Sequence, residues 1–322
     1  MFCASSVASP VTPGFHGLTA RRGFQSPVGV NAFPKYRGRL APSPTGYLHL
    51  GHARTFWLAQ QRARENGGTL VFRNEDLDST RFKMEFVPAM IEDLRWFGFE
   101  WQEGPDCDGP FAPYNQSERM NVYRAALEIL RAGNFIYPCT CSRKDIRQAV
   151  RAPHAEDEAE DDEVIYPGTC RGKMVGTPRC GVRSAQRADP TSRFAWRFRV
   201  PDGETISFVD GNCGEQRFVA GKDFGDFVVW RGDGVPAYQL ACVADDAAMQ
   251  ITEVVRGADL LVSTARQILL FRALGLTPPA FFHCPLWLDE TGFRLAKRHD
   301  VLSLRTLRAR GETPESLRRK QF

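Results

Sequence analysis

The order of β-prone and helical segments near the start of the sequence constrains the fold of this chain more than any other feature. A β-prone segment at 39–41 is followed by a turn-rich loop, a helical pattern at 52–65 and a second β-prone run at 69–73. An Asn-Gly-Gly sequence ends the helical pattern, since these residues adopt the conformations that stop a helix. A strand, a helix and a strand in this order predict a parallel sheet with right-handed crossovers.

Helical spacing of apolar residues recurs three times further along the chain. It predicts helices at 84–97, at 117–133 with Ser117 as its N-cap, and at 263–274. Residues 136–190 differ, because they are rich in Pro, Gly, Cys and charged residues and show little periodicity. We interpret this stretch as a small metal-stapled insertion.

The β-prone segments after this insertion predict a second kind of sheet. Residues 194–200 alternate in polarity, as an antiparallel strand with one wet face does. Segments 226–230 and 235–243 flank Asp233-Gly234 and predict a hairpin, and a further β-like run covers 281–288. The predicted fold class is therefore α/β, a doubly wound parallel sheet interrupted by a β-containing insertion.

Cysteine spacing and charge narrow the possible functions. Nine cysteines at scattered spacings do not form a secreted disulfide framework, and a Cys-x-Cys pair indicates metal binding in a reducing compartment. No run approaches the roughly 20 apolar residues that a membrane span requires. The net charge of +4 combines an acidic run at 156–163 with a basic stretch at 305–320, which suits a polyanionic partner.

The first 38 residues have the composition of an organelle transit peptide. They contain no Asp or Glu but several Ser and Arg residues, and no apolar core of a secretory signal. We expect a plastid or mitochondrial location if this segment is a transit peptide, and a cytoplasmic one otherwise. A disordered tail or a misplaced start codon is the alternative.

The loop and helix start at 41–52 have the features of a nucleotide site. His49 and His52 are three residues apart at the start of a helix, so both rings face the same side. Gly51 between them lets a flat ring approach the backbone, and the helix N-terminus favours anions. Histidines there could stabilise charge that develops when a carboxylate attacks the α-phosphate of ATP.

A basic motif near the end of the sequence strengthens the prediction of a nucleotide site. Arg294-Leu-Ala-Lys-Arg298 lies near the end of the sequence, and together with His49-Leu-Gly-His52 it resembles the two nucleotide-binding motifs of class I aminoacyl-tRNA synthetases. The resemblance implies a Rossmann-type fold that binds ATP with Mg²⁺. It assigns catalysis to His49, His52 and Lys297, and ATP binding to Pro42, Gly51, His49, His52, Arg294 and Lys297. Arg294 departs from the usual lysine, and Ala296 and Arg298 replace the usual serines.

Within this class the sequence resembles the glutamyl group, through four stretches that stand in the family's order. They are Arg39-Leu-Ala-Pro-Ser-Pro-Thr-Gly, Arg73-Asn-Glu-Asp-Leu-Asp78, Pro236-Ala-Tyr-Gln-Leu-Ala241 and Glu253-Val-Val-Arg-Gly-Ala-Asp-Leu260. Glutamate needs a cation for each carboxylate and an anion for its ammonium group, which Arg39, Arg256 and Glu75 can supply. The resemblance implies a glutamate site of Arg39, Ala41, Ser43, Glu75, Tyr238 and Arg256.

The insertion contains a candidate zinc site. Cys139-Thr-Cys141 and Tyr166-Pro-Gly-Thr-Cys170 could supply three thiolates and a phenolate to a structural Zn²⁺, although chemistry alone leaves Cys180 or His154 open as the fourth ligand. The pattern Cys139, Cys141, Tyr166, Cys170 resembles the zinc site of the glutamyl-queuosine tRNA(Asp) synthetases.

That family implies a specific organisation and reaction. We expect a catalytic domain at 39–305, with the insertion at 136–190, and a basic tail at 306–322 without an anticodon-binding domain. We expect a monomer, and the resemblance implies that it activates L-glutamate with ATP and transfers it to the queuosine base of tRNA(Asp). The alternatives are a truncated glutamyl-tRNA synthetase acting on tRNA(Glu), a ligase that passes glutamate to a small amine, and a non-catalytic zinc-containing RNA-binding module.

Overall fold

The computed structural model describes residues 35–77, 83–142, 144–146, 165–172, 194–286 and 303–321. Several predictions fall outside these ranges: the expected transit peptide up to residue 34, the acidic run at 156–163, and the basic motif with Arg294 and Lys297. His154 and Cys180, the alternative zinc ligands, also lie outside them. No helix of the described part is long and apolar enough to cross a membrane.

The predicted strand, helix and strand at the start of the domain are confirmed. β1 (Arg37–Leu40) and β2 (Thr69–Phe72) pair in parallel and α1 (Leu50–Glu65) connects them. α1 begins two residues before the predicted start, at Leu50, whose buried side chain packs in the core under the loop. Ala59 and Gln60 of α1 are both buried.

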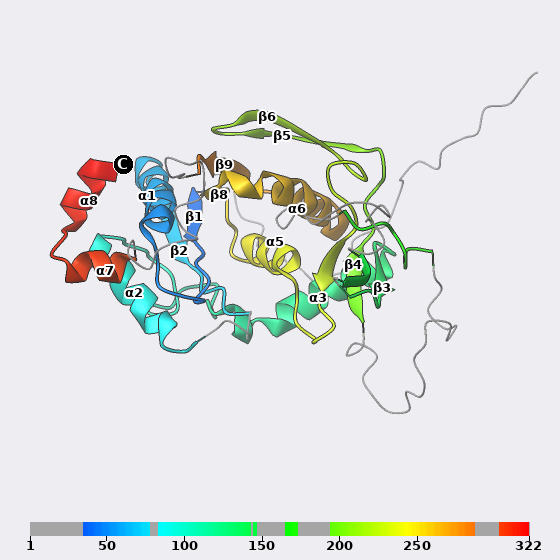
Figure 1. Cartoon of the computed structure of the whole chain (residues 1–322), viewed down its shortest axis with the longest axis horizontal. Coiled ribbons are helices and arrows are strands. Elements are labelled where there is room, and N and C mark those ends of the chain that lie inside the picture. Colours follow the sequence, from blue (N-terminus) through cyan, green and yellow to red (C-terminus); the bar gives the residue numbers. More distant parts are fainter. Residues whose placement is uncertain are drawn as a thin grey trace, which may run out of the picture. The chain divides into compact units, whose positions relative to one another are not determined.

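A second parallel pair lies beside the first (Figure 1). β8 (Glu253–Gly257) and β9 (Ala280–Cys284) are parallel and are connected by η2 (Ala258–Leu260) and α6 (Leu261–Leu274). Thr252 joins the two pairs, because its amide donates to the Arg37 carbonyl over 2.9 Å and its hydroxyl accepts from the Arg37 amide over 2.8 Å. The domain is thus α/β with parallel-containing sheets.

Two more helices follow β2. The predicted helix at 84–97 is present as α2 (Phe86–Phe97), but the helix predicted to start at Ser117 is not capped there. Ser117 lies within the 3₁₀ turn η1 (Gln116–Glu118), and α3 (Met120–Ala132) begins after it. The Ser117 amide and hydroxyl both donate to the Asp76 carboxylate, over 2.8 and 2.7 Å, so a tertiary contact engages the groups that an N-cap would use.

The antiparallel strand predicted at 194–200 is confirmed as β4 (Ala195–Phe198), in a sheet with β3 (Ile136–Cys139) from the start of the insertion and β7 (Phe227–Trp230) from beyond it. The three strands pair antiparallel in the order β3, β4, β7. The hairpin of β5 (Thr205–Asp210) and β6 (Gly214–Val219) instead adds to the second parallel pair, because β5 meets β9 at Asp210 and Phe281.

The hairpin predicted around Asp233-Gly234 forms, but its second arm is shorter than the predicted 235–243. Trp230 and Pro236 form an antiparallel bridge, the Arg231 amide donates to the Val235 carbonyl over 2.8 Å, and the chain then forms the helix α5 (Tyr238–Ala248). α5 is buried from Leu240 to Asp246. A short apolar run that is buried on most sides shows no helical periodicity, so sequence alone cannot distinguish it from a strand.

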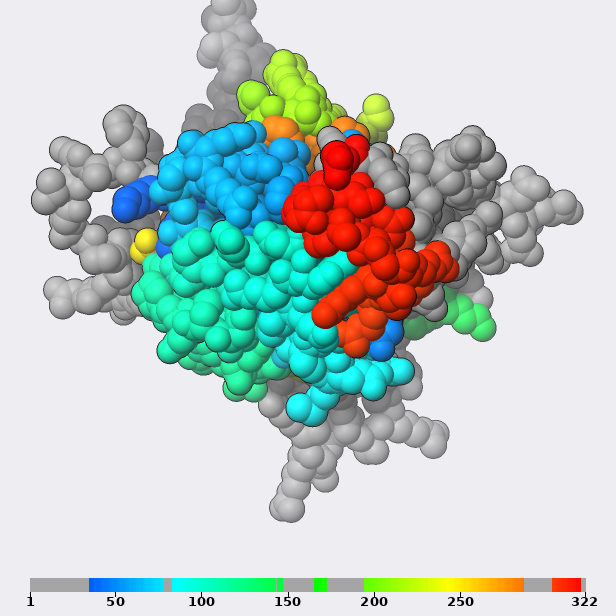
Figure 2. Space-filling model, turned by 90° about the vertical axis from the view of Figure 1, so that its left-hand side faces the viewer, coloured from blue at the N-terminus to red at the C-terminus, as the bar shows by residue number. Residues whose placement is uncertain are grey.

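The basic segment at the end of the chain is folded. α7 (Leu304–Ala309) and α8 (Pro314–Gln321) place Leu304, Leu307 and Leu317 in the same apolar core as β1, β2, α1 and α2. Figure 2 shows both helices, in red, lying beside α2, in cyan. The expected domain boundary at 305 therefore falls within α7.

Candidate active site

One cavity of about 800 Å³ opens beside the loop between β1 and α1. Its walls come from that loop, the first two turns of α1 and the ends of β8 and β9. The predicted site residues that line it are Arg39, Ala41, Pro42, Ser43, Gly51, His52, Glu75, Tyr238 and Arg256. Segments separated by up to about 200 residues in the sequence thus form one site.

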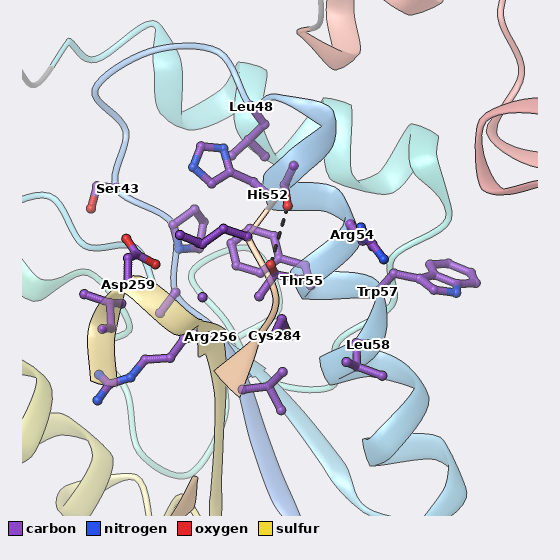
Figure 3. A pocket seen from close by; sticks show the side chains of 18 of the residues that line it. Ser43, Leu48, His52, Arg54, Thr55, Trp57, Leu58, Arg256, Asp259 and Cys284 are labelled. Carbon is purple, nitrogen blue, oxygen red and sulfur yellow. Dashed lines mark hydrogen bonds between the residues drawn. The ribbon is translucent and has the colours of Figure 1, made fainter. Parts of the chain in front are cut away.

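Polar groups gather at one end of this cavity. Ser43, His52 and Asp259 lie together there in Figure 3, whereas Arg54, Trp57 and Leu58 follow α1 away from them. Since acceptor and donor groups meet at the N-terminus of α1, this end suits a charged ligand.

The two histidines at the start of α1 have different positions. His49 is the N-cap of α1 and its backbone amide donates to Nδ1 of His52 over 3.4 Å, but only His52 lines the cavity. The rings lie 6.1 Å apart, so the spacing of three residues does bring them near each other. Although the ring of His52 is accessible to solvent, desolvation by the cavity walls and then the His49 ring lower its pKa below the usual 6.5. At neutral pH the His52 ring is uncharged and can donate one hydrogen bond.

Glu75 belongs to a buried network of charges at the strand ends. Its Oε1 accepts from Nη2 of Arg73 over 3.1 Å, and Nη1 of Arg73 donates to Asp246 over 2.7 Å. Arg39 approaches the same Asp246 carboxylate at 3.6 Å and donates through Nη1 to the Val255 carbonyl over 3.0 Å. These charges compensate one another, since a buried charge without a partner is strongly unfavourable.

Burial still opposes the charge of Glu75. Desolvation raises its pKa above the usual value, against the opposing effects of Arg73 and Arg39. A cation that entered the cavity beside Glu75 would therefore stabilise the carboxylate. An ammonium group is such a cation.

Arg256 and Tyr238 complete the predicted set. Arg256 is 5 % exposed at the fourth position of β8, and its Nη1 has no hydrogen-bond partner among the residues that the structure describes. Tyr238 is the first residue of α5, is 40 % exposed and lines the cavity. A cationic side chain and a tyrosine therefore both line this cavity.

Some cavity residues were not predicted. Asp259 lies within the quoted stretch 253–260, yet its carboxylate was not recognised as part of the wall. Its charge raises the pKa of His52, against the two effects that lower it. Thr45, Thr55 and Cys284 also line the cavity, and no signal in the sequence separates them from ordinary loop, helix and strand residues.

The predicted zinc ligands form one cluster in the insertion. The Tyr166 hydroxyl lies 3.4 Å from Sγ of Cys139 and 3.6 Å from Sγ of Cys141, and Sγ of Cys141 lies 3.6 Å from Sγ of Cys170. Ligands at about 2.3 Å from a tetrahedral Zn²⁺ would be separated by about 3.7 Å. The spacing of the donor atoms therefore fits such an ion.

The protonation of the cluster also fits a cation. Burial raises the pKa of Tyr166 and raises that of Cys141 to about 11. For Cys170, burial acts in the same direction, but hydrogen bonds from Tyr166, the Thr140 backbone and the other two thiols lower its pKa to about 7. A bound cation would displace the remaining protons from these groups into solvent, so the donor set can hold Zn²⁺.

Comparison with protein families identifies the catalytic domain. Residues 35–320 match the model of the tRNA synthetases of class I (E and Q), catalytic domain. A glutamate-tRNA synthetase from Elizabethkingia anophelis has a similar structure, with a TM-score of 0.67 and 32 % identity, over 82 % of this chain and 53 % of the other.

The curated proteins with similar sequences fall into two groups by name, Glutamyl-Q tRNA(Asp) synthetases and Glutamate--tRNA ligases. The Glutamyl-Q tRNA(Asp) synthetase of Nitratidesulfovibrio vulgaris is 47 % identical over 85 % of this chain and 82 % of its own length. That of Symbiobacterium thermophilum is 49 % identical over 87 % of this chain and 83 % of its own length. Glutamate--tRNA ligase 2 of Nitrosococcus oceani is 42 % identical over 87 % of this chain, but the match spans only 57 % of that protein.

Proposed function

Because this chain belongs to the class I tRNA synthetases of the E and Q group, and is a ligase of the glutamate type, we propose that it transfers glutamate to the queuosine base of tRNA(Asp). The observation that carries this proposal is the match to two Glutamyl-Q tRNA(Asp) synthetases over more than four fifths of their length.

The first step of the proposed reaction forms glutamyl-adenylate. An oxygen of the glutamate α-carboxylate attacks the α-phosphorus of ATP, and the bond from this phosphorus to the pyrophosphate oxygen breaks. The uncharged ring of His52 and the N-terminus of α1 face the cavity where negative charge would develop on the phosphate. His49 and Lys297 are proposed to assist from the loop before α1 and from the basic motif.

The charges of the cavity fit glutamate as the amino acid. Glu75 would hold the ammonium group, while Arg39 and Arg256 would each face a carboxylate. Mg²⁺ would supply charge compensation for the phosphates of ATP when bound.

The second step moves the acyl group to RNA. A hydroxyl oxygen of the queuosine cyclopentenediol attacks the carbonyl carbon of the adenylate, the bond to AMP breaks, and the hydroxyl proton is released.

We further propose that Cys139, Cys141, Tyr166 and Cys170 hold a structural Zn²⁺, and that the two parallel strand pairs belong to one doubly wound sheet.

A second function is supported by a specific observation. Relatives named Glutamate--tRNA ligase match at 40 to 43 % identity over 87 to 88 % of this chain, so charging of the 3′ end of tRNA(Glu) is the competing proposal. A non-catalytic RNA-binding module is less well supported, because such a module has no need to collect Arg39, Glu75 and Arg256 around one cavity.

The test is attachment of labelled glutamate, with ATP, to three purified RNAs. These are tRNA(Asp) with queuosine, tRNA(Asp) without it, and tRNA(Glu). We expect label only on the first. Label on tRNA(Glu) would instead support a minimal enzyme that charges tRNA(Glu). Label on none of the three RNAs would support the small-amine ligase or the RNA-binding module.

A further inference from the structure

Arg256 is held from one side by two neutral groups. Its Nε donates to Nε2 of His283 over 3.2 Å, and its Nη2 donates to the Thr264 hydroxyl over 2.6 Å. These two nitrogens form one edge of the planar guanidinium group. The edge that contains Nη1 is thus left for a substrate carboxylate, and Nη1 is buried without a partner in the described part of the chain.

The contact with Arg256 determines the protonation of His283. Because a guanidinium can only donate, Nε2 of His283 must accept, and the ring proton must sit on Nδ1. The Thr264 hydroxyl lies 3.0 Å from the same Nε2 and 3.1 Å from the Leu260 carbonyl, and whichever of the two accepts its proton, Nε2 of His283 acts as an acceptor. Burial lowers the pKa of the fully buried His283 below 6.5, so the ring is neutral at pH 7.

Asp210 holds the His283 proton in place. Its Oδ2 lies 2.6 Å from Nδ1 of His283 and accepts that proton. Its Oδ1 is fully engaged, since it accepts from the backbone amides of Cys213, Asn212 and His283 over 2.8, 3.0 and 3.2 Å. Oδ1 therefore anchors the carboxylate to the backbone, while Oδ2 holds the proton of the His283 ring on Nδ1.

The three residues stand on neighbouring strands. Arg256 of β8 lies directly opposite His283 of β9, and β5 reaches β9 at Asp210. The hydrogen-bonded series Asp210–His283–Arg256 thus crosses the sheet from the β5–β6 hairpin to the cavity wall. Paired strands are rigid, and a site built on them is held more closely than one on loops.

We propose that Asp210 and His283 are positioning residues that orient Arg256 toward a carboxylate of the amino-acid substrate. Asp210 fixes the tautomer of His283, and Nε2 of His283 then fixes the guanidinium plane. This inference rests on the proposed function, since it assumes that glutamate occupies the cavity.

The variant Asp210→Asn tests the proposal with a minimal change of shape. The three backbone amides would keep the amide oxygen of the new side chain in the Oδ1 position, so its NH₂ group would face Nδ1 of His283. His283 would then carry its proton on Nε2, directly against the Nε–H of Arg256. We expect the KM for glutamate to rise about 10- to 100-fold, in line with losing one charged hydrogen bond, while the KM for ATP stays unchanged.

Two variants of His283 provide an independent test if Asp210→Asn does not fold. The amide oxygen of His283→Gln can still accept from Arg256, whereas His283→Leu offers no acceptor. We expect His283→Gln to retain glutamate affinity better than His283→Leu does, as measured by calorimetric titration with glutamate.

A matched control is Asp226→Asn, a buried carboxylate that accepts from the Val200 amide and the Tyr137 hydroxyl in the antiparallel sheet. It should lower stability without changing the KM for glutamate. An unchanged KM in Asp210→Asn, or equal losses for glutamate and ATP, would overturn the positioning role. If the wild-type protein itself bound no glutamate, the proposed function would fail instead, so the two failures are distinguishable.

Discussion

The cavity and the cysteine cluster differ in how their charged and polar groups find partners. At the cavity, the wall residue Glu75 pairs with the buried Arg73, and Arg256 is held by His283 and Thr264, so the protein itself supplies the partners. In the cluster, Cys139, Cys141, Cys170 and Tyr166 face one another, and one protein cation, Arg197, donates to Sγ of Cys139 over 3.2 Å. The first arrangement is organised before any ligand binds, whereas the second requires a cation to be stable in its deprotonated form.

The largest expected effect comes from removing the central cation of the cavity network. Arg73→Met would leave Glu75, Asp245 and Asp246 without Arg73, which is fully buried and lies 2.7 to 3.8 Å from these carboxylates. We expect a loss of about 3–5 kcal/mol in the free energy of unfolding, measured by urea denaturation.

The control for this variant is Arg131→Met, whose side chain makes an exposed pair with Glu128. It should change the stability by less than about 1 kcal/mol. Equal effects of the two variants would show that the cavity charges are not organised by the protein alone.

Removal of metal should affect the cluster and not the cavity. If Zn²⁺ is bound at about 100 times its dissociation constant, a chelator should cost about 2.7 kcal/mol of stability, because the ion binds only the folded state. Thermal unfolding with and without chelator measures this loss, and Cys141→Ser should make it disappear. A chelator that abolished glutamate binding without lowering the melting temperature would contradict the separation of the two regions.

Glu75→Gln should separate binding from stability within the cavity. The neutral side chain loses the charge that faces an ammonium group, so we expect glutamate affinity to fall by about 2 kcal/mol, or roughly 30-fold. Because burial raises the pKa of Glu75, its charge opposes folding, and the variant should be at least as stable as the wild type at pH 7. Calorimetric binding and urea denaturation of the same preparation check both parts, and a clearly destabilised variant would contradict the second.

Lowering the pH should reduce the free energy of unfolding through protonation of His283. Its pKa is lowered in the folded state, so the unfolded chain takes up the proton first as the pH falls. The contribution of neutral His283 is fully present above about pH 6.5 and is lost below it, by at most about 1.4 kcal/mol per pH unit. Urea denaturation of wild type and His283→Gln between pH 5 and 8 measures this difference, which should shrink toward low pH. A difference that is independent of pH would show that His283 does not change its protonation on unfolding in this range.

Local patterns predicted much of the fold, and they failed where tertiary contacts prevailed. The alternation at 39–73 is confirmed, because strand and helix periods differ and glycines mark the helix end. Ser117 was misassigned because Asp76, which lies 41 residues earlier, engages its amide and hydroxyl. The stretch 238–243 was misassigned because α5 is buried without interruption from Leu240 to Asp246, so its apolar run resembles that of a buried strand.

The sequence by itself determined which residues could meet a carboxylate, an ammonium group or a metal ion, because those chemistries require particular side chains. The structure decided which of them meet. It brings Arg39, Glu75, Tyr238 and Arg256 to one cavity, leaves His49 outside its wall, and adds Asp259. It also decided the partners of Arg256, because His283 and Asp210 become its neighbours only through the pairing of β5, β9 and β8. Strand pairing depends on contacts between distant segments, which local residue patterns do not encode.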